Sequence, residues 1–364
     1  MKTLPLFATL SFIVFTAAAP PSQGGEAQVP ITAHEWGTFT TVSGSDGKLL
    51  PGLEVEEEAL PFFVAGFPGL GGFNKGFGEV PILAATVKME TPVIYFYADN
   101  REPIAASVKV GFEGGSISQW FPQRSGGEES PVKFAPADPA VPNRLQPLPV
   151  DFAQSRHGSA EWEFEILPQG EADPILALKP GEIPAWVHPR GPESNLIRNA
   201  ADGAVENYIF YRGIGNFEIP VTMSFEGDGV LVLKPEAAIG FALAYEMDES
   251  RRCRILWKGE LKSGSTARID ASPEAVPFQP EPALRPDLYA AMAGGLREAG
   301  LTGEEASAML RTWWLSYMDR PGVRVFWVAP RAFTDQILPL AIDPAPAELE
   351  RVIPYRAGSS VPEL

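Results

Sequence analysis

The chain contains Ile31-Thr-Ala-His-Glu-Trp-Gly-Thr-Phe-Thr-Thr-Val42, a stretch with a histidine, a carboxylate and an indole at consecutive positions. From Trp36 onward most residues are β-branched or aromatic, so we expect a β-strand with His34 and Glu35 at its leading edge. Adjacent side chains of a strand face opposite sides of a sheet. We therefore expect Trp36 to share a face with His34, and Glu35 to find its partners elsewhere in the chain.

Two interpretations of His34 and Glu35 stay open. In the first, His34 is a ligand or general base and Glu35 is a carboxylate whose pKa is tuned by apolar surface. Glu90 is a further candidate in this catalytic set, because it leads into a second apolar segment. In the second, His34 hydrogen-bonds a backbone carbonyl and Glu35 pairs with an arginine. The second is favoured, because no other histidine lies nearby and structural networks also perturb ionisable groups.

The rest of the chain predicts many short strands. It has 37 prolines and 35 glycines, which favour strands joined by turns. Residues 93–97 are almost continuously apolar, and residues 161–167 alternate glutamates with apolar side chains. Residues 106–112 and 116–121 flank Glu113-Gly114-Gly115 and predict a hairpin. This cadence is typical of an antiparallel β-sandwich, so the expected fold class is mainly β.

One region has helical character. Over residues 285–319, Gly300 suits a helix end, and Thr302 with Glu305 matches a capping box that opens a second helix. We expect an αα-hairpin packed on the sheets. The predicted organisation is a signal peptide at 1–19, a flexible leader at 20–30, a β-sandwich region at 31–280, the helical hairpin with a returning strand at 281–350, and a tail at 351–364.

The N-terminus predicts export. Lys2 precedes an apolar run that ends in small residues, the pattern of a secretory signal peptide. No later stretch approaches the ~18 apolar residues of a membrane span, so no stable membrane insertion is expected after signal removal. Cys253 is the single cysteine, so neither an intramolecular disulfide nor a lipid anchor after the signal is expected. The expected location is periplasmic or extracellular.

The net charge of −17 argues against nucleic acid and anionic membrane surfaces as partners, because both require a positive patch. No cofactor is predicted, although Ca²⁺ stays open as a partner of the alternating carboxylates Glu54, Glu56 and Glu58. The favoured explanation of these three residues is an acidic strand edge that discourages sheet pairing. The three histidines lie in unrelated contexts without compact spacing, so no metal site is predicted.

Three motifs together carry a resemblance. They are His34-Glu35-Trp36-Gly37-Thr38-Phe39-Thr40, Met89-Glu90-Thr91-Pro92-Val93-Ile94-Tyr95-Phe96-Tyr97 and Phe210-Tyr211-Arg212-Gly213-Ile214-Gly215-Asn216-Phe217. The chain resembles a group of exported bacterial proteins of unknown function. The resemblance covers most of the mature chain and implies export. It implies no reaction, cofactor or catalytic residue.

The residue inventory leaves three functions open. The first is a non-catalytic carbohydrate- or envelope-binding β-sandwich module, whose candidate ligand-binding residues are Trp36, Trp120, Tyr211 and Arg212. The alternatives are a glycoside-cleaving enzyme with paired carboxylates and a metal-dependent hydrolase. Arg212 fits either an ion pair with Glu35 or Glu90, or a substrate anion. Carboxylates converging beside an aromatic cleft would favour the enzyme, and a closed buried ion-pair network would favour the binding module.

Overall fold

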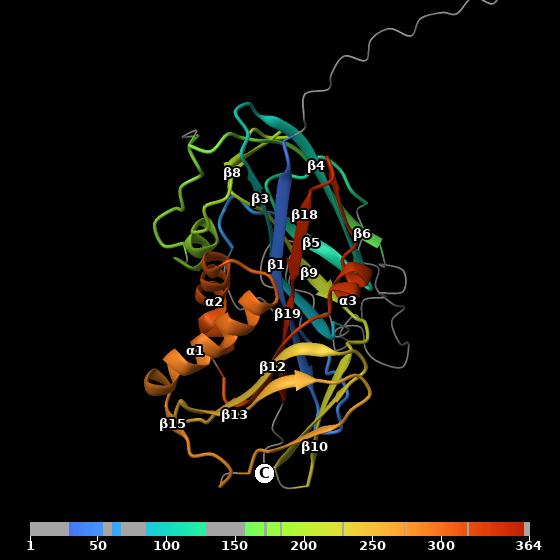
Figure 1. Ribbon diagram of the computed structural model, residues 1–364, viewed down its shortest axis with the longest axis vertical. Helices are drawn as coiled ribbons and strands as arrows, with labels where there is room; N and C mark the ends of the chain where they lie inside the picture. The colour runs from blue at the N-terminus through green and yellow to red at the C-terminus, as the bar shows by residue number, and fades with distance from the viewer. Residues whose placement is uncertain are drawn as a thin grey trace, which may run out of the picture.

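The computed structural model describes residues 29–53, 60–66, 85–128, 157–170, 173–182, 184–227, 229–272, 274–318 and 320–359. Strands form 46% of the structure and helices 17%, in several antiparallel sheets and a few helices. The prediction of a mainly β fold is therefore confirmed. Figure 1 shows β1 (Ile31–Ser43) running through the middle of the molecule, with α1 (Glu281–Glu298) and α2 (Gly303–Tyr317) on one side and α3 (Arg331–Ile337) on the other.

The largest sheet has eleven strands within the described residues. Its order is β15 (Gln279–Pro280), β13 (Arg252–Leu261), β12 (Ile239–Met247), β16 (Gly322–Val328), β19 (Pro354–Ser359), β1, β3 (Val87–Ala98), β9 (Ile209–Gly215), β5 (Gly115–Phe121) and β2 (Ala65–Gly66), with β18 (Glu348–Val352) beside the first half of β1. Neighbouring strands are antiparallel, except that β1 runs parallel to β18 and β19. β1 is therefore paired along both edges and occupies an interior position.

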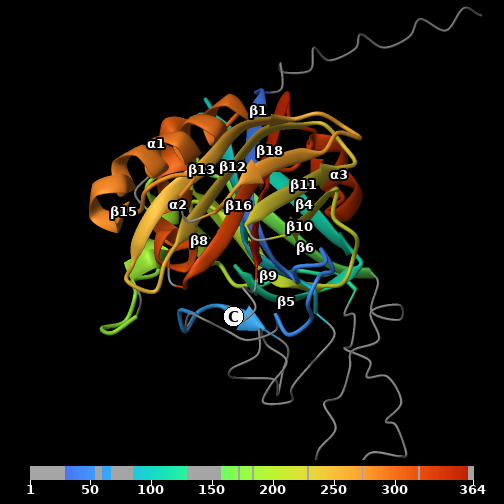
Figure 2. The ribbon, with the colours of Figure 1, turned by 90° about the horizontal axis from the view of Figure 1, so that it is seen from below.

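Two smaller sheets and the helices complete the described structure (Figures 1 and 2). The five-stranded sheet has the order β17 (Leu340–Asp343), β4 (Ile104–Glu113), β6 (His157–Ile166), β7 (Ile197–Asn199) and β8 (Val205–Glu206). The three-stranded sheet consists of β10 (Val221–Glu226), β11 (Val230–Pro235) and β14 (Ala267–Asp270). The helices are α1 (Glu281–Glu298), α2 (Gly303–Tyr317), α3 (Arg331–Ile337) and the 3-10 helix η2 (Pro184–Arg190). None of the described helices is both long and apolar enough to cross a membrane.

The large sheet separates two hydrophobic cores. On one face, side chains such as Phe39 and Phe96 pack against the five-stranded sheet, where Trp162 and Phe164 alternate with outward glutamates as predicted. On the other face, Trp36 and its neighbours pack with apolar residues of α1 and α2. The alternation of side chains along a strand explains how one sheet supplies both cores. We call these the sheet-facing core and the helix-facing core.

The expected hairpin of residues 106–121 is wrong. β4 pairs with β6 in the five-stranded sheet, whereas β5 pairs with β9 in the large sheet. The chain changes sheet at Gly114, whose φ of +78° suits glycine because it has no Cβ. A side chain on the next residue, Gly115, would approach the Phe112 ring to within 2.3 Å. The glycine pair therefore marks a crossing between sheets.

The C-terminal residues also differ from expectation. We expect a tail over 351–364, but residues up to Ser359 form the end of β18 and all of β19, and residues 360–364 lie outside the described part of the chain. β19 lies between β1 and β16, with buried side chains from Pro354 to Ala357. Because both faces and both edges are covered, its sequence lacks the polar–apolar alternation that identifies a half-exposed strand.

Candidate functional site

His34 and Glu35 lie on opposite faces of β1, as their adjacent positions predict. The His34 side chain contacts α2, and Trp36 lies on the same side in the helix-facing core. Glu35 points the other way and contacts β9 and β18. The two residues therefore do not form a catalytic pair with each other, and each belongs to a separate cluster.

The Glu35 cluster consists of Glu35, Tyr211, Arg351 and Asp335. Arg351 Nε donates to Glu35 Oε2 at 2.6 Å, and the Tyr211 hydroxyl donates to Glu35 Oε1. The Glu35 and Arg351 side chains are 0% and 1% exposed. Arg351 Nη1 also donates to Asp335 Oδ1 at 2.7 Å, and the Asp335 carboxylate is partly exposed. This cluster is a closed ion pair whose outer end reaches the surface only through Asp335.

Electrostatics hold the Glu35 cluster in its charged form. Burial favours the neutral form of Arg351, but the charge of Glu35 outweighs it and raises the pKa of the guanidinium. Burial, followed by the charge of Glu35, raises the pKa of Tyr211 well above its usual value. A phenol that stays protonated remains a hydrogen-bond donor to the carboxylate. Because a buried ion pair that loses one partner leaves an uncompensated charge, removing either Glu35 or Arg351 alone should destabilise this arrangement of β1, β9 and β18.

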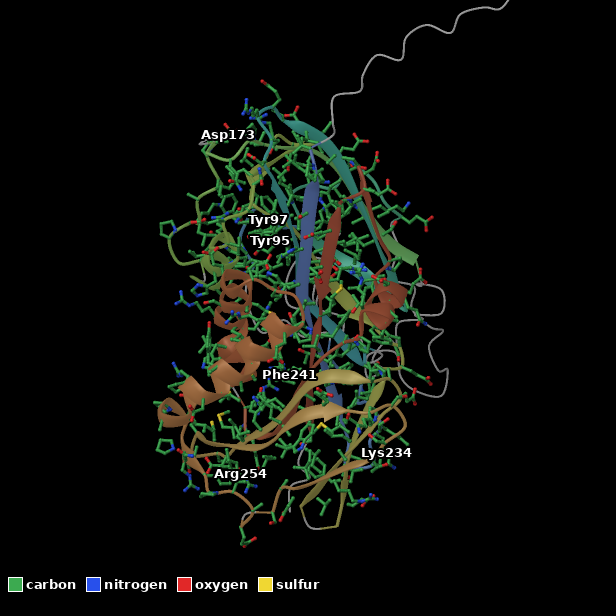
Figure 3. The ribbon with its side chains drawn as sticks, viewed as in Figure 1. Tyr95, Tyr97, Asp173, Lys234, Phe241 and Arg254 are labelled. Atoms are coloured by element: carbon green, nitrogen blue, oxygen red, sulfur yellow. The ribbon has the colours of Figure 1, made fainter. Side chains whose placement is uncertain are left out.

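The His34 cluster consists of His34, Glu305, Tyr97 and Thr302. His34 Nδ1 lies 3.0 Å from both carboxylate oxygens of Glu305, and the Tyr97 hydroxyl donates to Glu305 Oε1 at 2.7 Å. Glu305 Oε2 accepts from the Thr302 backbone N–H at 2.8 Å, and the Thr302 hydroxyl accepts from the Glu305 N–H at 3.1 Å. The predicted capping box is thus present, and its glutamate also binds the histidine. Figure 3 shows Tyr97 beside β1, above α2.

Protonation of the His34 cluster follows from its contacts. Burial disfavours the imidazolium, but the hydrogen bond and charge of Glu305, with Glu350 and Glu348, outweigh burial and raise the pKa of His34. Burial also disfavours the Glu305 carboxylate, but His34 and the capping hydrogen bonds outweigh it and lower the pKa of Glu305. Glu305 is fully buried, whereas the His34 side chain is 12% exposed. His34 is therefore an oriented histidine at the edge of solvent, bound to a carboxylate instead of the backbone carbonyl expected from sequence.

The remaining candidate residues lie on neighbouring strands of the large sheet, since Met89 of β3 pairs with Gly213 of β9 and Trp120 of β5 pairs with Tyr211 of β9. Glu90 forms a buried ion pair with Lys88 at 2.9 Å, and Arg212 Nε donates to Gln119 Oε1 at 2.5 Å. Glu35 takes its charge partner from Arg351, so the suggested Glu35–Arg212 pair is wrong. Trp120 is 3% exposed, and Arg124 lies 4.1 Å over its ring.

Burial does not fit the predicted aromatic binding surface. Seven of the eight tryptophans are buried, and the remaining one, Trp257, is partly buried. Of the candidate ligand-binding residues, Trp36 and Tyr211 are 0% exposed and Arg212 is 1% exposed. A ring must present a free face to stack on a sugar, so these residues cannot contact a polysaccharide in this conformation. In this structure these side chains pack inside the protein.

The three sequence motifs come together in the large sheet, where β1, β3 and β9 are neighbours. The β1–β3 pairing shifts register between Trp36 and Thr38, and the β3–β9 pairing shifts register between Met89 and Val93. A Cβ on Gly37 would lie 2.7 Å from the Pro92 Cα, and one on Gly213 would lie 1.9 Å from the Ser116 carbonyl oxygen. The glycines therefore permit close backbone contacts. This accounts for part of the motifs by packing alone.

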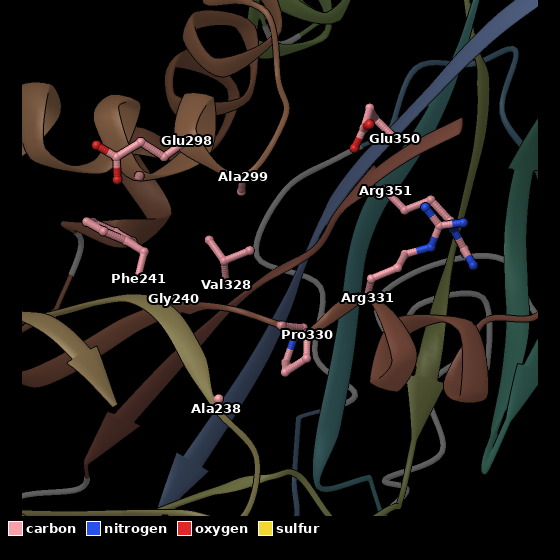
Figure 4. A pocket seen from close by; sticks show the side chains of 12 residues that line it. Ala238, Gly240, Phe241, Glu298, Ala299, Val328, Pro330, Arg331, Glu350 and Arg351 are labelled. Atoms are coloured by element: carbon pink, nitrogen blue, oxygen red, sulfur yellow. The ribbon is translucent and has the colours of Figure 1, made fainter. Parts of the chain in front are cut away.

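A cavity of about 290 Å³ lies close to both clusters. It is lined by the C-terminal end of α1, the start of β12, the end of β16, the first residue of α3 and, from β18, Glu350 and Arg351 (Figure 4). Arg351 belongs to the Glu35 cluster, and Glu350 is the β18 residue paired in register with His34. This cavity therefore lies beside residues of both clusters.

Metal ligation has no candidate in the described residues, since no three His, Cys, Asp or Glu side chains there are placed to hold an ion. Glu54, Glu56 and Glu58, for which Ca²⁺ stays open, lie outside the described residues. The Cys253 thiol is buried, and burial, with Glu281 and Asp248, raises its pKa to about 11. The neighbouring arginines therefore do not produce a reactive thiolate.

Sequence analysis missed three residues of these clusters, namely Glu305, Arg351 and Asp335. The capping box places Glu305 in the first turn of a helix but gives no indication of His34, which lies 271 positions away. Arg351 lies 316 positions from Glu35, in a segment interpreted as a tail. The segment that contains it begins with the alternation Glu348-Leu349-Glu350, and this is the signal that could identify β18.

Comparison with known proteins gives no assignment. No family model matches the chain, and no curated protein matches it. Among solved structures, the yeast delta-COP-I mu-homology domain, alone and complexed with a Dsl1 WxWxV peptide, aligns with 92% of this chain and 98% of its own. Sequence identity is 7% in both cases, and the TM-scores are 0.30 and 0.29. These scores are too low to support a shared fold or function.

Proposed function

We propose that this protein is an exported, non-catalytic binding module for a component of the cell envelope. The observation that carries the proposal is the closed Glu35 cluster, in which the central carboxylate is 0% exposed and already bound by Arg351 and Tyr211. Glu90 is likewise paired with Lys88 in a buried site. Glycoside cleavage needs two carboxyl groups that flank an accessible bond. Carboxylates held in this way serve folding better than bond cleavage.

The signal-peptide pattern and the resemblance to exported bacterial proteins support the proposed location. A polysaccharide is the weaker choice of ligand. Sugar rings commonly stack on exposed tryptophans, and seven tryptophans of this chain are buried. We therefore place other envelope components ahead of polysaccharides.

The proposal is tested with the purified mature protein against isolated envelope fractions and insoluble polysaccharides, with retention and new reducing ends both recorded. We expect retention without release. A Glu35→Gln variant that is folded by circular dichroism should be retained equally. Release of reducing ends that disappears in this variant would overturn the proposal in favour of a carboxylate-dependent glycosidase.

A second candidate, an acid–base enzyme, is favoured by one observation. A buried carboxylate bound to one imidazole nitrogen is the arrangement that orients catalytic histidines. His34 has this relation to Glu305 and is partly exposed. Hydrolysis of an ester or glycoside panel that is lost in His34→Gln, with the fold intact, would select this candidate over the binding module.

We also propose a finer description of the fold, in which the sheets form a β-sandwich and α1 with α2 forms an αα-hairpin on its outer face. The two cores on opposite faces of the large sheet support it. So does the hydrogen bond of 2.9 Å between Thr38 of β1 and Tyr317 of α2.

A further inference from the structure

α2 is held on the large sheet by a polar contact near each of its ends. Near its start, Glu305 binds His34 of β1 at 3.0 Å and Tyr97 of β3 at 2.7 Å. At its end, the hydroxyl oxygens of Tyr317 and of Thr38 in β1 lie 2.9 Å apart. We call these the start contact and the end contact. One helix is therefore attached to one strand at two points whose chemistry differs.

The start contact changes its charge near neutral pH, and the end contact does not. Burial lowers the pKa of His34, but the hydrogen bond and charge of Glu305 outweigh burial and raise it above the usual 6.5. Thr38 does not titrate, and burial raises the pKa of Tyr317 well above its usual value. A rise in pH from 6 therefore removes the charge of His34 and leaves the end contact unchanged.

His34 is the group that can carry positive charge in acidic surroundings. The titratable groups near it come from three elements, namely Glu304 and Glu305 of α2, Tyr95 and Tyr97 of β3, and Glu348 and Glu350 of β18. Burial raises the pKa of both tyrosines well above the usual value, so both stay protonated. The charge balance around the start contact therefore depends on His34.

The carboxylate of Glu350 lies against the α1–α2 connection. Glu350 is paired in register with His34, and its carboxylate and the Arg351 guanidinium point to opposite sides of β18 (Figure 4). A Cβ on Gly300, in the α1–α2 connection, would lie 2.8 Å from Glu350 Oε2. Once His34 is neutral, Glu350 and Glu305 face each other as like charges, and their repulsion favours separation of the connection from β18.

The buried carboxylate of Glu305 depends on the charge of His34. Its side chain is 0% exposed, and both of its carboxylate oxygens lie 3.0 Å from His34 Nδ1. A neutral imidazole can still donate a hydrogen bond through Nδ1, but it no longer compensates the negative charge. A buried charge without a charged partner is costly, and exposure to water relieves that cost. Exposure of Glu305 requires the first turn of α2 to move away from β1.

We propose that the start contact is a pH-sensitive switch. Protonated His34 holds the first turn of α2 on β1, and loss of its proton lets this turn and the α1–α2 connection open while the end contact keeps the rest of α2 in place. The proton passes to solvent, since the His34 side chain is 12% exposed. Opening uncovers Leu301 and Ala306, which are buried in the helix-facing core. The inference goes beyond the proposed binding function and does not rest on it.

Hydrogen exchange of the full mature protein at pH 6 and pH 8.5 provides the test, with each rate divided by the intrinsic rate at the same pH. The Ala306 N–H donates to the Thr302 carbonyl at 3.0 Å and reports on the first turn, and the Met318 N–H donates to the Trp314 carbonyl at 3.1 Å and reports on the end. We expect the protection of Ala306 to fall by about 10-fold or more at pH 8.5, and that of Met318 by below about 2-fold. Unchanged protection of Ala306, or an equal fall at both amides, would overturn the proposal.

Substitution of either partner should remove the pH dependence. His34→Gln should leave Ala306 weakly protected to the same extent at both pH values. Glu305→Gln keeps the capping box, because glutamine also serves at this position, and it leaves no buried charge for His34 to compensate. Its Ala306 protection should likewise differ by below about 2-fold between the two pH values. A fall of about 10-fold that persists in either variant would contradict the switch.

His188→Gln is the matched control, because His188 lines a cleft beside the same turn of α2 together with Gly303 and Glu304. Burial, with Arg311, lowers the pKa of His188, so its charge should change little between pH 6 and pH 8.5. This variant should keep the fall in Ala306 protection. Loss of the pH dependence in His188→Gln would show that His34 is not the group that responds, and the proposal would be wrong.

Discussion

The Glu35 and His34 clusters begin at adjacent residues and have opposite characters. Glu35 faces the inner side of the large sheet and is bound by Arg351 and Tyr211 with no exposed surface. His34 faces the helices and keeps 12% of its side chain exposed while Glu305 holds one of its nitrogens. Two neighbouring ionisable residues can therefore differ in role because strand geometry sends them into different surroundings. We infer that the closed cluster serves the fold, whereas the His34 cluster keeps exposed surface on its imidazole.

The largest expected effect comes from breaking the closed cluster. Arg351→Met should lower the free energy of unfolding by about 3–5 kcal/mol, because Glu35 is left as a buried unpaired charge. Urea denaturation at pH 7 measures it. Arg331→Met is the control, since Arg331 also binds Asp335 but is 44% exposed and should cost below about 1 kcal/mol. Similar losses of unfolding free energy in both variants would contradict the distinction between the buried Glu35–Arg351 pair and the exposed Arg331–Asp335 pair.

The His34 cluster should show a smaller, pH-dependent effect. His34 has a pKa raised above its usual 6.5, so its charge stabilises the fold below pH 6.5, and this contribution is lost as pH rises through the raised pKa. Glu305 has a lowered pKa and stays ionised at pH 6. His34→Gln should therefore cost about 1.5–3 kcal/mol at pH 6 and much less at pH 9.

Denaturation at both pH values, with His188→Gln as control, checks this prediction. Burial, with Arg311, lowers the pKa of His188, so its substitution should not reproduce the loss at pH 6. A loss for His34→Gln that is equal at pH 6 and pH 9 would show that the imidazolium–Glu305 pair contributes nothing.

The register shift beside both clusters should also be sensitive. Gly37→Ala places a Cβ 2.7 Å from the Pro92 Cα, and the resulting displacement of β1 against β3 should cost about 1–3 kcal/mol. Gly303→Ala is the control, because nothing lies within 4 Å of its added Cβ and it is helical. That variant should be neutral or more stable by about 0.4–1 kcal/mol. Thermal unfolding of the two proteins compares them, and an unaffected Gly37→Ala protein would contradict the close contact.

Thiol labelling gives the smallest effect and compares the two cores. Cys253 lies in the helix-facing core with a pKa raised to about 11 by burial. A maleimide at pH 7 should therefore label the native protein no faster than it unfolds. Faster labelling would show that α1 and α2 move away from the sheet in the native state.

Sequence patterns predict local features of this fold well and distant ones poorly. The strand at β1, the opposite faces of His34 and Glu35, and the capping box at Thr302 all follow from short-range rules. The partners of these residues do not, because Arg351 and Glu305 come from segments about 300 positions away. β19 is missed for a related reason, since a strand covered on both faces shows no alternation. The cavity likewise joins five elements, namely α1, β12, β16, α3 and β18, and has no sequence signature.

The central claim, that Glu35 serves the fold, is tested most directly by a double-mutant cycle between Glu35 and Arg351. The free energy of unfolding is measured for the parent protein, Glu35→Gln, Arg351→Met and the double variant. The closed ion pair predicts a coupling energy of about 2 kcal/mol or more, with the double variant more stable than Arg351→Met alone. A coupling energy near zero would contradict the claim and leave Glu35 free for a functional role.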